Sequence, residues 1–169
     1  TQSGIAQLVE KCRAAQIHLV QVESNPLDQV WADQPPAPMA PVYPHPVDIA
    51  GRSAAEKIAE AAAVIQRHGA KSAVLTAPDS IAWLLNIRGG DLPNTPVSLG
   101  FAILSASGTV DLFMDERKIT SAALIEIGES VSLRQPGEFG MALATLGTVG
   151  SPVLVAPSSA PIWVSNQLQ

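Results

Sequence analysis

The sequence has little charge, few aromatic rings and a single cysteine. Only 15% of its 169 residues are charged, against roughly 25% in an average soluble domain. This low content indicates that part of the surface of the protein is normally buried against another protein surface. The net charge is −5 and Lys and Arg are scattered singly, so the clustered basic face of a nucleic-acid-binding protein is missing. Cys12 alone allows neither an internal disulfide nor a cysteine-based zinc finger. Its place in a helical pattern predicts a buried or half-buried thiol.

Long hydrophobic runs and targeting signals are also missing. No segment approaches the roughly 18 apolar residues of a membrane span, and no signal peptide opens the chain. We therefore expect a cytoplasmic protein with no membrane partner. The chain begins at Thr1, and no charged residue lies between Phe139 and Gln169. Both features predict a piece excised from a longer chain, with the size of one domain.

The residue patterns of common active sites are absent as well. The three histidines, His18, His45 and His68, fall in separate predicted elements, and no HExxH motif is present. The sequence contains neither a GxSxG elbow nor a phosphate-binding GxxxxGK[ST] loop. We therefore expect no metal site, no serine nucleophile and no nucleotide site, and we assign no catalytic residue.

The first 48 residues predict an arm rather than a compact unit. Residues 4–15 carry a helical apolar stripe, and residues 17–22 are typical of a short strand or extended segment. Asn25 followed by Pro26 predicts the start of a short helix that ends near Trp31. Residues 33–48 then hold six of the fourteen prolines, which favours an extended strap lying against the domain over a ligand for a proline-binding module. The predicted division is an arm with a proline strap over 1–48 and an α/β domain over 49–169.

The remaining residues alternate helical and strand patterns. Ser53 and Glu56 form a capping box at the start of a helix that Gly69 ends, and an apolar strand follows over 72–77. A second helix is predicted from Pro78 to Asn86. Two strands, 99–105 and 109–115, are joined by a tight turn and predict a hairpin. Helices over 119–128, 138–146 and 160–168 and strands over 131–133 and 152–156 complete an α/β fold, a mixed sheet of about five or six strands flanked by helices.

One loop combines charge with flexible backbone. In Asn86-Ile87-Arg88-Gly89-Gly90-Asp91, two glycines separate an arginine from an aspartate. The first interpretation is an ion pair within the loop that braces the turn. The second is a loop that meets a substrate or another domain.

The amino-acid sequences of several segments resemble motifs of the aminopeptidase P family. The run from Thr76 to Asp91 is similar to that family's "TALDEIAWLLNLRGSD". The segment from Asn25 to Trp31 resembles its "NLVDxIW", and Asp111-Leu112-Phe113-Met114-Asp115 resembles its "TLFVD". The same order and spacing hold over essentially the whole chain. One departure is Ser98-Leu99, where the family often has two large rings in "NPVFFSY".

The resemblance implies a middle domain with the creatinase N-terminal fold. In the family, a following "pita-bread" domain binds two metal ions, commonly manganese, through two Asp, one His and two Glu, and cleaves an N-terminal residue ahead of proline. None of those ligands matches a residue of this sequence. The resemblance further implies a homodimeric parent in which this domain contacts the C-terminal catalytic domain and shapes access of the peptide substrate. It makes Asn86, Arg88, Gly89 and Asp91 the candidate substrate-binding residues, on a loop that faces the cleft.

We therefore expect a non-catalytic domain of a metal-dependent X-prolyl aminopeptidase, inactive alone and without a cofactor of its own. Two alternatives remain open: a stand-alone interaction module of the same fold, and a domain of a creatinase-like pita-bread hydrolase. An Asp/Asp/His/Glu/Glu set encoded after Gln169 would support an enzyme, and its absence would support the module.

Overall fold

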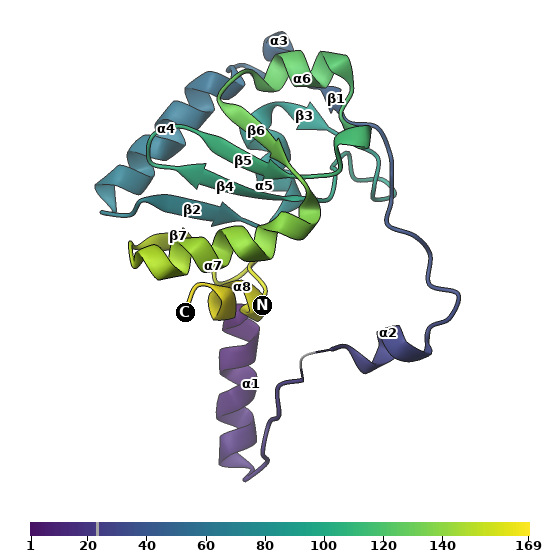
Figure 1. Cartoon of the computed structure of the whole chain (residues 1–169), viewed down its shortest axis with the longest axis vertical. Coiled ribbons are helices and arrows are strands. Elements are labelled where there is room, and N and C mark those ends of the chain that lie inside the picture. Colours follow the sequence, from purple (N-terminus) through teal and green to yellow (C-terminus); the bar gives the residue numbers. More distant parts are fainter. Residues whose placement is uncertain (23) are drawn as a thin grey trace.

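A five-stranded mixed sheet forms the centre of the protein (Figure 1). The computed structural model describes residues 1–22 and 24–169. The strands lie in the order β6 (Val131–Arg134), β5 (Val110–Phe113), β4 (Phe101–Ser105), β2 (Ser72–Leu75) and β7 (Val153–Val155). Strand β4 pairs antiparallel with β2 and β5, whereas β6 and β7 add in parallel at the two edges. The predicted α/β class and mixed sheet are confirmed.

Helices cover both faces of this sheet, because its strands alternate apolar side chains between two hydrophobic clusters. On one face, Leu104 and Leu112 pack against α4 (Ala54–Arg67), α5 (Pro78–Leu85) and α6 (Ser121–Ile127). On the other, Ile103 and Phe113 pack against α7 (Phe139–Val149) and α8 (Ile162–Gln167). Phe139 of the second cluster contacts the rings of Phe113 and Trp163, and its own ring is stacked on Phe101 at 4.4 Å between centroids.

Local sequence signals fix several of these elements. The predicted capping box of α4 is present, with Ser53 Oγ accepting from the Glu56 N–H and the Glu56 carboxylate accepting from the Ser53 N–H. Gly69, just after this helix, adopts φ +68°. The predicted hairpin is confirmed as β4–β5, with Gly108 at φ +86° in the turn.

Two predicted boundaries are wrong because capping residues intervene. The helix expected over 119–128 begins two residues later, as α6, and a short 3-10 turn, η1 (Glu116–Lys118), precedes it. Asp115 caps η1 and Thr120 caps α6 through their side-chain oxygens. A second 3-10 turn, η2 (Pro136–Glu138), precedes α7.

The N-terminal residues project from this body (Figure 1). Helix α1 (Gln2–Ala14) and helix α2 (Pro26–Val30) contain no buried residue, and residues 17–22 form neither a helix nor a strand. Cys12 is half-buried, as predicted. The proline strap is exposed over residues 33–39 and joins the domain only from Ala40, with Val42 fully buried. The second half of the strap therefore contacts the domain, whereas residues 33–39 do not.

The end of the strap forms the small structure that positions the candidate loop. Strand β1 (Tyr43–Pro44) pairs antiparallel with β3 (Ile87–Arg88), and the short helix α3 (Val47–Ala50) follows β1.

Within the described residues, no helix has the length and apolar character needed to cross a membrane.

Candidate functional site

The candidate loop begins where α5 ends at Asn86. This residue adopts left-handed φ +52°, ψ +46° and is 1% exposed; asparagine is among the few residues that tolerate this conformation. Its side-chain amide is hydrogen-bonded at both ends, because Lys57 Nζ donates to Asn86 Oδ1 while Asn86 Nδ2 donates to the Arg52 carbonyl at 2.9 Å and to the Glu126 carboxylate at 3.5 Å. Asn86 therefore anchors the loop from inside the domain.

Lys57 is a buried cation that sequence reasoning missed. Its Nζ also donates to the Trp83 carbonyl at the end of α5 and lies 4.8 Å from the centre of the Trp83 indole. Burial lowers the pKa of the Lys57 ammonium, and the nearby positive charges of Arg88 and Arg52 lower it further. A signal was available: Lys57 falls on the apolar stripe of α4, where a charged residue is unexpected unless it has buried partners.

Arg88 leaves β3 half-buried and turns back onto α5. Its Nη1 donates to the carbonyls of Ile87 at 2.8 Å and Ala82 at 3.2 Å. In the described part of the chain, Nε and Nη2 have no hydrogen-bond partner and no carboxylate pairs with the guanidinium. Among the four candidate residues, Arg88 is thus the one whose side chain has unused hydrogen-bond donors within the described structure.

Gly89 is required by close packing rather than by backbone conformation. A Cβ at this position would lie 2.7 Å from the Ser98 Cβ and 3.0 Å from the Ser98 backbone nitrogen. The loop from Gly89 and the segment after Pro96 therefore lie in direct contact, and Gly89 N–H donates to the Pro96 carbonyl at 3.4 Å.

Asp91 is the most enclosed charge of the loop. Its side chain is 0% exposed and forms an ion pair with Lys118 of η1, whose side chain is 4% exposed. The same carboxylate accepts from Leu99 N–H at 2.6 Å, Ser98 Oγ at 2.9 Å and Ala40 N–H at 3.3 Å. It therefore joins the strap, the loop after Pro96 and η1. The predicted ion pair within the loop is wrong, since Asp91 pairs with Lys118 and Arg88 binds carbonyls.

The pKa of the Asp91 carboxyl reflects two opposing effects. Burial raises it, but hydrogen bonds from Lys118, Leu99 and Ser98 lower it more, so the net pKa lies below the ordinary value. The carboxylate is therefore charged near neutral pH, and its lone pairs are committed to donors of the same domain.

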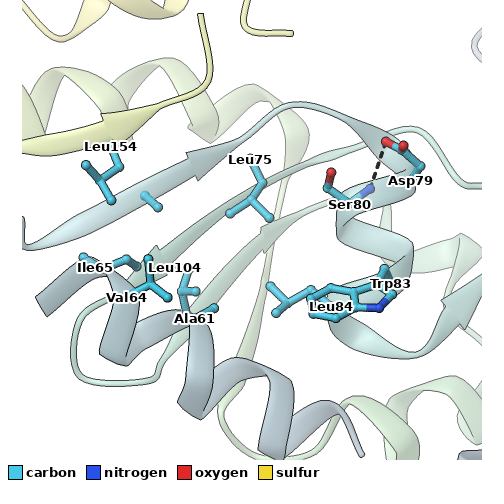
Figure 2. A pocket seen from close by; sticks show the side chains of 11 residues that line it. Ala61, Val64, Ile65, Leu75, Asp79, Ser80, Trp83, Leu84, Leu104 and Leu154 are labelled. Carbon is cyan, nitrogen blue, oxygen red and sulfur yellow. Dashed lines mark hydrogen bonds between the residues drawn. The ribbon is translucent and has the colours of Figure 1, made fainter. Parts of the chain in front are cut away.

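An open apolar groove lies apart from this loop, between α4, α5 and the β7 edge (Figure 2). Its volume is about 540 Å³, and Figure 2 shows Val64, Trp83 and Leu154 around it. The polar residues at its rim are Asp79 and Ser80, and the Ser80 N–H donates to the Asp79 carboxylate at 2.9 Å. None of the four candidate residues lines the groove.

The described residues contain no group of three or more His, Cys, Asp or Glu side chains placed to hold a metal ion. The three histidines lie in an exposed segment, in the strap and at the end of α4. Within the described ranges, the candidate site therefore consists of buried side chains that hold the loop in place and of Arg88, which has unused hydrogen-bond donors. It contains neither an acid–base pair nor a metal centre.

Comparisons with known proteins agree with this fold. The sequence profile of the creatinase/prolidase N-terminal domain matches residues 33–169. A probable Xaa-Pro aminopeptidase P of Ajellomyces capsulatus is 36% identical over 135 residues, which are 79% of this chain and 21% of the relative. The protein of the same name in Coccidioides posadasii is 40% identical over 117 residues, 69% of this chain and 19% of the relative.

A solved structure shares the fold. The X-prolyl aminopeptidase of Caenorhabditis elegans, described as a cytosolic enzyme with a di-nuclear active site, superposes with a TM-score of 0.80 and 24% identity over 92% of this chain and 26% of that chain. The present chain thus spans about a fifth of the length of the curated relatives it matches. On the match of residues 33–169, the chain belongs to the creatinase/prolidase N-terminal domain family.

Proposed function

We propose that these residues are the non-catalytic middle domain of a metal-dependent X-prolyl aminopeptidase, which releases the N-terminal residue from peptides with proline in second position. The observation that carries the proposal is the 36–40% identity to proteins named probable Xaa-Pro aminopeptidase P across 69–79% of the chain. The matched residues make up only about a fifth of the length of those relatives. The rest of such a chain is long enough to contain a C-terminal catalytic domain, which we propose as the partner of this domain.

The metal chemistry belongs outside these residues. A di-nuclear centre needs several carboxylate or imidazole ligands around each ion, and the described residues bring no such group together. The residues present therefore do not fit a pair of metal ions, and no catalytic step is assigned to them. The parent enzyme is expected to be a cytoplasmic homodimer that uses two divalent ions, with manganese as the expected metal.

Within that enzyme, the candidate loop shapes access to the cleft and contributes one contact to the peptide or to the catalytic domain. Arg88 is the contact residue, because its Nε and Nη2 have no partner among the described residues and a planar guanidinium can bind a carboxylate or carbonyl through two parallel donors. Asn86, Gly89 and Asp91 support it by holding the backbone on either side. The predicted division into 1–48 and 49–169 stays part of this proposal.

Hydrolysis of an Arg-Pro-Pro peptide tests the proposal at two levels. The chain 1–169 is expected to release no arginine with Mn²⁺ present, whereas the longer polypeptide that contains it is active. In that longer polypeptide, Arg88→Ala is expected to raise KM about tenfold, which corresponds to about 1.4 kcal/mol of lost binding, and Arg88→Lys is the matched control that keeps the charge. Unchanged KM and kcat in Arg88→Ala would refute the contact, and hydrolysis by residues 1–169 alone would refute the whole assignment.

A further inference from the structure

Two cations bind the carboxyl end of α5, and the proposed function uses one of them. Arg88 Nη1 donates to the Ala82 carbonyl at 3.2 Å, and Lys57 Nζ donates to the next carbonyl of the same helix, that of Trp83. The last carbonyls of an α-helix lack partners within the helix and form its negative end. Lys57 and Arg88 therefore bind adjacent acceptors at one negative helix end.

Lys57 reaches this helix end from the neighbouring helix α4 and is almost completely buried, with 2% exposure. Burial lowers the pKa of its ammonium, the positive charges of Arg88 and Arg52 lower it further, and the Glu126 carboxylate acts in the opposite direction. An apolar side chain of similar length would fill the same space without the cost of burying a charge. Packing between α4 and α5 therefore does not explain why a lysine stands at this position.

The hydrogen bonds of Lys57 leave Arg88 few acceptors on the helix end. The Ala82 carbonyl accepts from the Asn86 N–H as well as from Arg88, so both of its lone pairs are engaged. The next carbonyl along the helix end, that of Trp83, is bound by Lys57. Asn86 is itself fixed by Lys57, which donates to its Oδ1. Lys57 thus controls the acceptor that lies next to the one Arg88 already uses.

A guanidinium beside a helix end gains free energy from each carbonyl it binds. Arg88 nevertheless has no partner for Nε and Nη2 among the described residues. Lys57 accounts for this in two ways, because it occupies the Trp83 carbonyl and because its positive charge repels a second cation.

We propose that Lys57 is a positioning residue for Arg88. Bound to the Trp83 carbonyl, it prevents the guanidinium from turning inward onto the end of α5 and so leaves Nε and Nη2 available to a carboxylate or carbonyl of a ligand. Lys57 acts through Arg88 and touches no substrate. The effect on peptide binding rests on the proposed function, whereas the arrangement of the two cations does not. A lysine that merely caps α5 would affect stability without changing the orientation of Arg88.

Labelling of arginine side chains with phenylglyoxal, followed by mass spectrometry, tests the orientation of Arg88 in the chain 1–169 without any assay of activity. In Lys57→Met, Arg88 is expected to react about fivefold more slowly than in the wild type, because one additional hydrogen bond holds the guanidinium inward. The exposed Arg67 is the internal control, and its rate should not change. Lys71→Met makes the same substitution at an exposed lysine and should leave the rates at both arginines unchanged.

Three outcomes of this labelling would overturn the proposal. Faster reaction of Arg88 in Lys57→Met would show a loosened helix end, and an unchanged rate would show that water takes the place of Lys57 on the Trp83 carbonyl. Failure of Arg88 to react in the wild type would show that its donors are not available, and this result does not depend on whether the variant folds. Thermal unfolding followed by circular dichroism establishes that Lys57→Met is folded.

Hydrolysis of an Arg-Pro-Pro peptide by the longer polypeptide tests the effect on binding. Lys57→Met is expected to raise KM about tenfold with unchanged kcat, and to have no further effect on KM when Arg88 is already alanine. An additive rise in the double variant would refute the proposal, because Lys57 would then act independently of Arg88.

The two experiments separate this inference from the proposed function. Slower labelling of Arg88 in Lys57→Met together with an unchanged KM in Arg88→Ala would refute the peptide contact and leave the positioning role standing. A KM that rises in Arg88→Ala but not in Lys57→Met would refute the positioning role alone.

Discussion

Asp91 and Lys118 form an ion pair that water barely reaches, and removing one partner tests how strongly it holds the candidate loop. Replacing Lys118 by Met keeps the aliphatic length but removes the cation. Asp91 would then stay buried with three donors, from Ala40, Ser98 and Leu99. Replacing Asp91 by Asn has a larger cost, because the buried Lys118 ammonium would lose its counter-charge and keep only neutral acceptors, the amide oxygen of the new side chain and the Leu99 carbonyl at 3.4 Å.

Breaking a buried pair from one side costs about 3–5 kcal/mol, because the remaining charge is left uncompensated. We expect about 3 kcal/mol for Lys118→Met, whose partner keeps its hydrogen bonds, and about 4–5 kcal/mol for Asp91→Asn. The double variant leaves no unpaired charge, so its loss should be smaller than the sum of the two by about 2 kcal/mol.

Urea unfolding of the four proteins at pH 7, followed by circular dichroism, gives the free energies for this double-mutant cycle. A loss below about 1 kcal/mol for either single variant, or a coupling below about 0.5 kcal/mol, would refute the view that the pair holds the loop, the strap and η1 together.

The same pair predicts a pH dependence. Folding lowers the pKa of the Asp91 carboxyl, since hydrogen bonds from Lys118, Leu99 and Ser98 outweigh the burial that raises it. The folded state therefore binds this proton less tightly than the unfolded state, and the stabilisation is complete above the unfolded pKa of about 3.9. It is lost as the pH falls below that value through the folded pKa. Between pH 5 and pH 2, Asp91→Asn should accordingly lose less unfolding free energy than the wild type.

Two further predictions concern neighbouring positions. Gly89→Ala is expected to lower the free energy of unfolding by about 1–3 kcal/mol, because the new Cβ would meet the Ser98 Cβ at 2.7 Å. Gly137→Ala is the control, since the space around Gly137 is open, and it should change the melting temperature little. Equal melting temperatures for the two variants would contradict the packing argument. Asp115 has a pKa lowered to about 2 by hydrogen bonds from the Arg117 side chain and N–H, so its carboxyl carbon should titrate near pH 2 in an NMR experiment. In Arg117→Ala that midpoint should rise toward the ordinary value of about 3.9, and an unchanged midpoint would show that Arg117 is not the cause.

Elements with a local chemical signal could be predicted from the sequence. The capping box at Ser53 and Glu56 marked the start of α4, and the Asn25–Pro26 pair marked α2. The turn around Gly108 fixed the hairpin, because only a short connection brings its two strands side by side. In each case the residues that specify the structure lie within a few positions of one another.

The candidate site could be predicted only in part, because its decisive contacts are distant in sequence. Lys118 lies 27 positions after Asp91, and nothing near either residue indicates the pairing. The two-residue ladder of β1 with β3 is too short to leave a periodic pattern.

The strand order has a consequence for how the chain folds. Strands β4 and β5 are neighbours in sequence and lie in the middle of the sheet, whereas β7 aligns Val153 with Ser72 of β2, far back along the chain. Contacts between near neighbours form with little loss of chain entropy, and distant parallel pairings form late. Folding is therefore expected to begin at the central β4–β5 hairpin. The β7 edge should form last, together with the packing of the α8 residue Val164 into the second cluster.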